Sequence, residues 1–205
     1  EAMLTKTFSR HGYYLYSTKD YMSRVRGGHN FMQIRISDEK VEGPDEGIDL
    51  LLALNEESVE IHLSEMNEDG TILSEVESDK DEMVYIDAKG IAKEVNPRAV
   101  NTVFVGAAFK IMGLPTDQAE EAVKEHFAKK ESVVDDNLEL LKKGYEAVDQ
   151  LYNLKDLGKK EDRMVIDGNS AVGLGALLGG LSYYTAYPMS PSTGILHYVA
   201  SKQEE

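Results

Sequence analysis

An unbroken apolar segment, GIDLLLALN, occupies Gly47–Asn55. A strand without polar alternation has no face suited to water, so it is typical of a parallel sheet that helices cover on both sides. The following residues read as a helix in EESVEIHLSEM, then as strands in GTILSE and in Met83–Ala88. Strand, helix and strand in succession predict right-handed βαβ units and an α/β fold, with a Rossmann-like, mostly parallel sheet and flanking helices.

Further apolar patterns predict the elements on either side of this unit. Ala99–Met112 is apolar on nearly every face and ends in GLP, which indicates a buried helix. Thr116 can cap the next helix and Ser132 can start another, whose apolar residues are too few for a coiled coil. Upstream, the pattern predicts a helix in Met3–Arg10 with Gly12 as its cap, and strands in Tyr13–Ser17 and Phe31–Ser37.

A polar segment rich in lysine and aspartate, Gln150–Asp162, divides the pattern in two. After it, the sequence predicts a short strand, a helix of small residues and a second strand in Tyr183–Pro188. We therefore expect a first domain in residues 1–149, a linker in 150–162 and the beginning of a second α/β domain in 163–205.

Composition excludes several classes of function. The chain has 205 residues, of which 37 are acidic and 22 basic, and its net charge of −15 argues against a nucleic-acid or anionic membrane surface. No apolar run is long enough to span a bilayer, and the first residues have no signal-peptide pattern. Because there is no cysteine, this chain cannot form disulfides or ligate iron–sulfur clusters through thiolates, which is compatible with a reducing cytoplasm.

Most catalytic motifs are absent. The glycine-rich stretch after Asp167 has Leu178 where the dinucleotide-binding fingerprint needs glycine, so close helix packing explains its glycines better. The five histidines are scattered without a metal-binding spacing, and no serine lies in a G-x-S-x-G motif. The sequence therefore predicts no metal site.

Two turns remain as candidate binding sites. Arg24 and Arg26 flank a turn in which Gly27 and Gly28 permit close backbone approach, so it can hold a phosphate or carboxylate; equally, its arginines can pair with the chain's own carboxylates. In the second turn, we expect Ser190 as an N-cap, with Pro191 in the first helical position. Hydroxyls and helix N–H groups there suit a carboxylate, although capping alone explains the same residues.

The sequence resembles the 2-oxoacid:ferredoxin oxidoreductases. The likeness to their gamma domain runs through SRVRGGHNFMQIRIS, IDLLLALNEES, NTVFVGAAFKIMGLP and LLKKGYEAV. GNSAVGLGALLGGLSYYTAYPMSPSTGIL then looks like the start of the family's pyrimidine-binding alpha domain, of the thiamine-diphosphate type. The family's opening strand and glycine-rich loop do not precede this match, and the rest of the alpha domain would follow it, so we expect a truncated piece that is inactive alone.

The resemblance implies a function for both turns. The family motif YPITPSS matches the substrate-binding candidates Tyr187, Pro188, Ser190, Pro191, Ser192 and Thr193. Ser190 stands where relatives have the threonine that contacts the 2-oxoacid, and it is the candidate catalytic residue. Gamma domains are associated with coenzyme A and with subunit contacts, so Arg26, Gly27 and Gly28 face one or the other.

The implied enzyme oxidatively decarboxylates a 2-oxoacid, with 2-oxoglutarate favoured, to an acyl-CoA and passes electrons to ferredoxin. Thiamine diphosphate, Mg and iron–sulfur clusters would lie on a partner beta subunit in a cytoplasmic homo- or hetero-oligomer, with none held by this chain alone. The alternatives are a pyruvate or indolepyruvate oxidoreductase subunit and a non-catalytic CoA-binding or assembly module.

Overall fold

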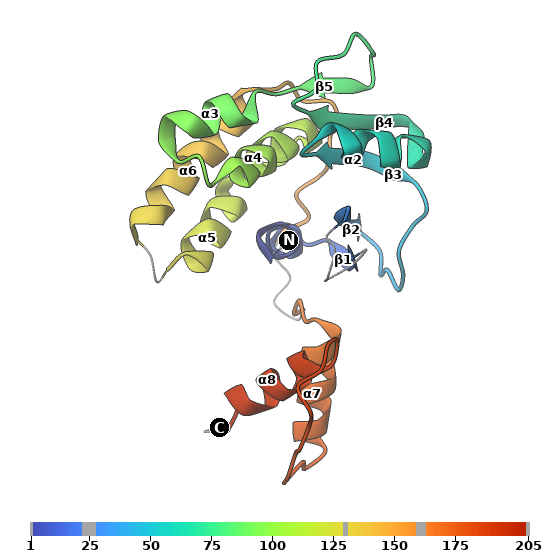
Figure 1. Ribbon diagram of the computed structural model, residues 1–205, viewed down its shortest axis with the longest axis vertical. Coiled ribbons are helices and arrows are strands. Elements are labelled where there is room, and N and C mark those ends of the chain that lie inside the picture. The colour runs from blue at the N-terminus through green and yellow to red at the C-terminus, as the bar shows by residue number, and fades with distance from the viewer. Residues whose placement is uncertain (1, 22–27, 129–130, 159–162, 204–205) are drawn as a thin grey trace. The chain divides into compact units, whose positions relative to one another are not determined.

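The computed structural model describes residues 2–21, 28–128, 131–158 and 163–203. The chain divides into two compact units, Glu1–Glu161 and Asp162–Glu205. The first unit contains, in order, α1 (Ala2–Arg10), β1 (Tyr14–Tyr21), β2 (Asn30–Ser37), β3 (Ile48–Ala53), α2 (Glu56–His62), the short 3₁₀ helix η1 (Leu63–Glu65), β4 (Met66–Ser74), β5 (Met83–Tyr85), α3 (Ala88–Val95), α4 (Val100–Met112), α5 (Asp117–His126) and α6 (Glu131–Glu146) (Figure 1).

The first unit contains the parallel sheet that the apolar segments predict. Strands β3, β4 and β5 pair in parallel in that order, and α2 lies between β3 and β4 in the chain. The α/β fold with flanking helices is therefore confirmed. Strand β3 is nevertheless only half-buried between Leu50 and Leu52, because it lies at the edge of the described sheet, whereas Ile72 and Leu73 of the central strand β4 are fully buried.

Strands β1 and β2 form a separate antiparallel hairpin, a pairing that the sequence pattern does not predict. The face expected to be apolar is confirmed, since Met32, Ile34 and Ile36 pack against the buried residues of α1 and α4. Leu15 of β1 packs against the same cluster, so side chains of both strands hold the hairpin on the core.

The buried helix predicted from Ala99–Met112 is α4, and it forms the centre of the core. Phe104, Phe109 and Ile111 are almost entirely buried, and Gly113 ends the helix in a left-handed conformation with φ of 75°. Helix α4 packs so closely along α6 that a Cβ atom added to Gly106 would lie 2.0 Å from the Leu141 carbonyl oxygen. Glycine therefore permits the close approach of the two helices.

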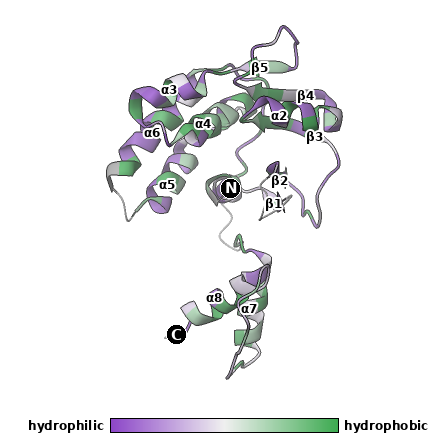
Figure 2. Cartoon of the chain, viewed as in Figure 1, coloured by the Kyte–Doolittle hydropathy of each residue, from purple (hydrophilic) through white to green (hydrophobic). Residues whose placement is uncertain are grey.

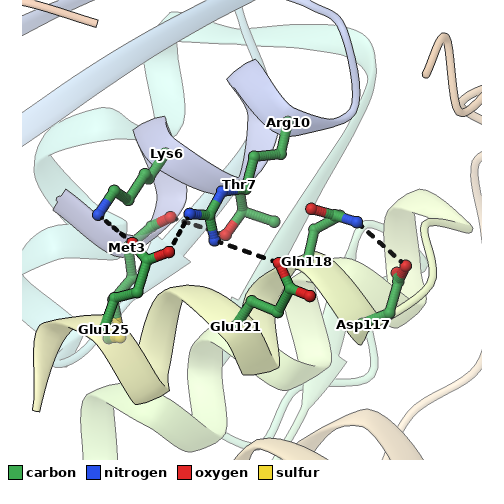
Figure 3. Close-up of polar contacts among 8 residues, drawn as sticks. All are labelled: Met3, Lys6, Thr7, Arg10, Asp117, Gln118, Glu121 and Glu125. Atoms are coloured by element: carbon green, nitrogen blue, oxygen red, sulfur yellow. Dashed lines mark hydrogen bonds and ion pairs between the residues drawn. The ribbon is translucent and has the colours of Figure 1, made fainter. Parts of the chain in front are cut away.

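Charged side chains join α1 to α5 (Figure 3). Glu125 accepts from Lys6 Nζ and from Arg10 Nη2, each at 2.5 Å, and Arg10 Nη1 lies 3.9 Å from Glu121. These two hydrogen bonds, from Lys6 first and then Arg10, lower the pKa of the Glu125 carboxyl group. The contacts fix the first helix of the described chain to a helix more than a hundred residues later in the sequence.

Residues 150–158 have no helix or strand, yet they are bound along the first unit. Leu151 and Tyr152 donate backbone N–H groups to the Ile111 carbonyl, and Leu157 donates to the His11 carbonyl. The Tyr13 hydroxyl also donates to the Lys155 carbonyl at 2.6 Å. The described part of the polar segment that the sequence assigns to a linker thus belongs to the surface of this unit.

The described residues 163–203 of the second unit form two helices, α7 (Gly168–Leu178) and α8 (Thr193–Ser201), which pack against each other. The predicted helix of small residues is confirmed as α7. The strands predicted before it and in Tyr183–Pro188 are wrong, since the described residues 163–167 and 181–189 have no strand structure. A strand requires a hydrogen-bonded neighbour, and in the described second unit neither stretch has one.

Candidate functional site

The candidate substrate turn lies directly before α8. Ser192 donates its backbone N–H and its hydroxyl to the Met189 carbonyl oxygen, at 3.1 and 3.0 Å. This closes a turn whose two central residues are Ser190 and Pro191, joined by a cis peptide bond. The expected N-cap at Ser190 and first helical position at Pro191 are therefore wrong. Both residues are used in the turn, so Ser192 is the N-cap and the helix begins at Thr193.

The first residues of α7 hold this turn from one side. Asn169 donates its side-chain amide to the Pro191 carbonyl oxygen at 2.8 Å, and a Cβ atom on Gly194 would lie 2.7 Å from the same amide nitrogen. Further along, Gly173 lies against the Tyr198 ring. No sequence motif marks Asn169 as part of this site, and its one signal is its place directly after the glycine that opens α7.

Asp167 supports the start of α7 and so the position of Asn169. Its carboxylate caps the helix by accepting from the Ser170 hydroxyl at 2.6 Å and from the Ser170 backbone N–H at 3.1 Å. These hydrogen bonds, that from the hydroxyl first, lower the pKa of the Asp167 carboxyl group. The hydrogen bonds therefore favour the ionised form of Asp167, which is the form that caps the helix.

Exposed side chains surround the turn. Tyr187 is 83% exposed and Met189 is 65% exposed, while Pro188, Ser190, Pro191 and Ser192 are exposed and Thr193 is half-buried. The structure thus brings Ser190 to Thr193 together at the start of one helix, with Tyr187 and Pro188 on the incoming chain. Hydroxyl groups and the positive end of a helix dipole are suited to a carboxylate or carbonyl oxygen.

Of the glycine-rich candidate loop, only Gly28 is described by the structure. Arg26 and Gly27, like Arg24, lie outside the described residues. Gly28 is exposed and has φ of 143°, a conformation that side-chain-bearing residues rarely adopt, and its carbonyl accepts from the Asn30 amide at 3.3 Å. The backbone conformation therefore explains why glycine occupies position 28, whether or not the loop binds a ligand.

Two histidines that are far apart in the sequence meet in the fold. The Nε2 atoms of His29 and His62 lie 2.9 Å apart, although 33 residues separate them. No spacing rule could have paired them, because the contact depends on how β2 lies against the end of α2. Within the described ranges, no group of three or more ligand-type side chains could hold a metal ion, and no helix has the length and apolar character needed to cross a bilayer.

Comparison with known proteins shows the family. Residues 1–147 match the family described as pyruvate ferredoxin/flavodoxin oxidoreductase. A curated relative from a Sulfolobus species, 2-oxoacid:ferredoxin oxidoreductase subunit alpha, is 26% identical over 94% of this chain. The chain spans 38% of that relative's length.

Solved structures agree with the sequence comparison. The 2-oxoglutarate:ferredoxin oxidoreductase from Magnetococcus marinus, with 2-oxoglutarate, coenzyme A and succinyl-CoA bound, superimposes with a TM-score of 0.83 and 27% identity. That alignment covers 97% of this chain and 38% of the other. The pyruvate oxidoreductase subunit PORC from Thermotoga maritima aligns over 71% of this chain and 85% of its own, with a TM-score of 0.57 and 26% identity.

Proposed function

Because the chain belongs to the pyruvate ferredoxin/flavodoxin oxidoreductase family, we propose that it is part of a 2-oxoacid:ferredoxin oxidoreductase. Residues 1–149 would form its gamma domain, 150–162 a linker, and 163–205 the start of its alpha domain. The alignment of a separate oxidoreductase subunit over 71% of the chain, and of an alpha subunit over 94%, supports this division. The likeness to a 2-oxoglutarate enzyme favours 2-oxoglutarate as the substrate.

The exposed apolar surface of the second unit supports its place in a larger domain. Among the residues that the structure describes in this unit, no large hydrophobic side chain is fully buried, and Figure 2 shows apolar residues on both helices. Leu178 is 81% exposed, and Met164 before α7 is 71% exposed. Further α/β elements packed on this surface would supply the burial that two short helices lack.

The observation that carries the proposal is the closed turn from Met189 to Ser192 at the start of α8. Asn169 donates to the Pro191 carbonyl, so the turn that contains Ser190 is held directly before the start of the helix. In the proposed reaction, this hydroxyl donates a hydrogen bond to the carboxylate or carbonyl of the 2-oxoacid. Ser192 and Thr193 add hydroxyls to the same end, while Tyr187 and Pro188 border it.

The cofactors would be held by other parts of the enzyme. Thiamine diphosphate with Mg, on a beta subunit, supplies the electron sink for decarboxylation when bound, and iron–sulfur clusters there would carry electrons to ferredoxin. The chain has no cysteine, so it cannot supply the thiolate ligands that iron–sulfur clusters use. The loop at Arg26, Gly27 and Gly28 would contact coenzyme A or a neighbouring subunit, and the assembled enzyme would work in the cytoplasm.

The test is to co-express the full reading frame with its beta subunit and to measure 2-oxoacid-dependent reduction of ferredoxin. We expect coenzyme A-dependent turnover of 2-oxoglutarate, with less of pyruvate or indolepyruvate, and none from the isolated 205-residue chain. If the enzyme preferred pyruvate or indolepyruvate, the assignment of 2-oxoglutarate as substrate would be wrong, but the assignment to a 2-oxoacid oxidoreductase would stand. Turnover by the isolated chain, or a stable lone oligomer that binds coenzyme A without a thiamine-binding partner, would overturn the proposal.

A further inference from the structure

His62 lies at the last turn of α2 and is held between two groups. Its ring is almost completely buried, with 4% of the side chain exposed. On one side its Nδ1 lies 2.6 Å from Glu65 Oε2, and on the other its Nε2 lies 2.9 Å from His29 Nε2. The three side chains form a chain of hydrogen bonds from the carboxylate through one imidazole to the other.

The carboxylate determines which nitrogens carry protons. An ionised Glu65 only accepts, so His62 must donate through Nδ1–H. In neutral His62 the Nε2 atom then has a lone pair, and His29 must donate to it through its own Nε2–H. The neutral pair therefore contains one N–H···N bond, in which His29 is the donor.

Adding one proton to the histidine pair preserves the hydrogen bond between the two Nε2 atoms, whereas adding two protons breaks it. A single proton makes either ring an imidazolium, which still donates to a lone pair on the other ring, and such charge-assisted bonds are the stronger ones. The Glu65 carboxylate and the C-terminal end of α2 both favour this positive charge. When both rings are imidazolium, both Nε2 atoms carry hydrogen, and two like charges face each other where the bond was.

Phe31 shows that the contact is part of the packing at this end of the hairpin. Its ring lies edge-on to His62, with centroids 4.7 Å apart, and stacks with His29 at 5.9 Å. The other end of the hairpin continues into the buried Tyr13, next to α1. By contrast, Tyr21 and Phe31 at the near end are 61% and 39% exposed. The histidine pair thus provides a polar contact between this end of the hairpin and α2.

We propose that His29 and His62 form a proton-operated clamp that holds the Asn30 end of the hairpin to the end of α2. With no proton or one proton added, the clamp is closed. With both rings protonated it opens, and the start of β2 separates from His62. In the described chain, the titratable groups that contact His62 are His29, before β2, and Glu65, in η1. The clamp needs no substrate, so it stands or fails independently of the proposed enzyme activity.

The test is hydrogen exchange of the 205-residue chain, read at the backbone amides of residues 30–32 and corrected for intrinsic exchange. Between about pH 8 and a pH low enough to protonate both rings, we expect their protection to fall about fivefold to tenfold, as the loss of one hydrogen bond predicts. EDTA is kept in the buffer. Metal-dependent imidazole shifts without it would overturn the proposal, because an ion would then occupy the place of the proton.

Three variants test whether the pH dependence comes from the His29–His62 pair. His62→Phe keeps an aromatic ring without a titrating group, and His29→Phe removes the partner in case the first variant does not fold. In either variant the protection should not depend on pH over this range. His126→Phe changes a histidine of α5 that contacts Phe127, and it should retain the pH dependence of the unchanged chain.

Nitrogen NMR spectra of the imidazole rings show independently, at high pH, which ring nitrogens carry protons. Protonated Nδ1 on His62 and protonated Nε2 on His29 are expected. The opposite assignment would overturn the proposal, as would protection that is constant with pH in the unchanged chain.

Discussion

The hydroxyl of Tyr152 lies 2.9 Å from the hydroxyl oxygen of Thr71, and it thereby joins the segment after α6 to the central strand β4. The same hydroxyl is within hydrogen-bond distance of the Asp49 and Asp69 carbonyl oxygens, at 2.9 and 3.1 Å. One side chain thus contacts both β3 and β4, which explains why a polar segment without helix or strand stays bound to the sheet.

Removing this hydroxyl should destabilise the first unit. In Tyr152→Phe the ring keeps its packing, but Thr71 and the carbonyl that accepts from the Tyr152 hydroxyl lose a partner, and we expect a loss of about 1–2 kcal/mol in the free energy of unfolding. Chemical denaturation followed by circular dichroism measures it. Tyr183→Phe is the matched control, since Tyr183 is 81% exposed and its change should have no measurable effect. Equal stability of the two variants would show that the Tyr152 contacts are not retained in solution.

The contact between α4 and α6 should not accept a side chain at its two glycines. A Cβ atom on Gly106 would lie 2.0 Å from the Leu141 carbonyl oxygen, and one on Gly144 would lie 2.1 Å from the Val103 carbonyl oxygen. Either helix must move away to admit a methyl group, so each alanine substitution should destabilise the fold by about 1–3 kcal/mol or more. The measurement is the midpoint of thermal unfolding.

A matched control separates this clash from a general effect of alanine. Gly175 lies inside α7 and has no described atom within 4 Å of an added Cβ. Gly175→Ala should leave the midpoint unchanged or raise it, because alanine is the better helix former. If Gly106→Ala behaved like Gly175→Ala, the close contact would not exist as described.

The contact of α1 with α5 should weaken in acid. The pKa of Glu125 is lowered by hydrogen bonds from Lys6 and Arg10, so the stabilisation is present above the ordinary glutamate value of about 4.3 and is lost as pH falls through the lower folded value. Because the Glu125 side chain is 48% exposed, the effect should stay below about 1 kcal/mol and shrink in high salt.

Glu125→Gln provides the measurement for this contact. At neutral pH its unfolding midpoint should lie below that of the unchanged chain, and the difference should vanish in acid. The same change at the exposed Glu60 of α2 serves as the control. A difference that persists at low pH would point to packing, not charge, as the role of Glu125.

In the assembled enzyme, the Ser190 hydroxyl should matter more than its neighbours. Ser190→Ala removes the proposed donor to the 2-oxoacid, and a lost hydrogen bond to a charged group should reduce kcat/KM about tenfold to a hundredfold. Ser190→Thr keeps the hydroxyl and should retain most of the activity. Ser201→Ala, at the other end of α8, is the control. Equal activity of the alanine and threonine variants would exclude Ser190 from substrate binding.

Asn169 should act as a positioning residue. Its amide donates to the Pro191 carbonyl, so Asn169→Ala frees the turn without touching the Ser190 hydroxyl. We expect a raised KM for the 2-oxoacid with a smaller change in kcat. An Asn169→Asp variant, which keeps the shape but removes the donor, should behave like alanine. Full activity of both variants would show that the turn keeps its position without this bond.

Elements with a strong local signal follow from the amino-acid sequence. The apolar residues of α4, followed by Gly113 and Pro115, mark a buried helix and its end because burial and backbone conformation act within a few residues. The succession of β3, α2 and β4 likewise indicates a parallel sheet before any contact is known.

Other features depend on residues that are distant in the chain. Residues 183–188 have the composition of a strand, yet no strand forms, because a strand exists only beside a hydrogen-bonded neighbour and the described second unit supplies none. Ser190 has the chemistry of an N-cap, but the turn held by Asn169 moves the start of the helix to Thr193. His29 meets His62 only because the hairpin lies against the end of α2, a contact between elements that no local pattern encodes.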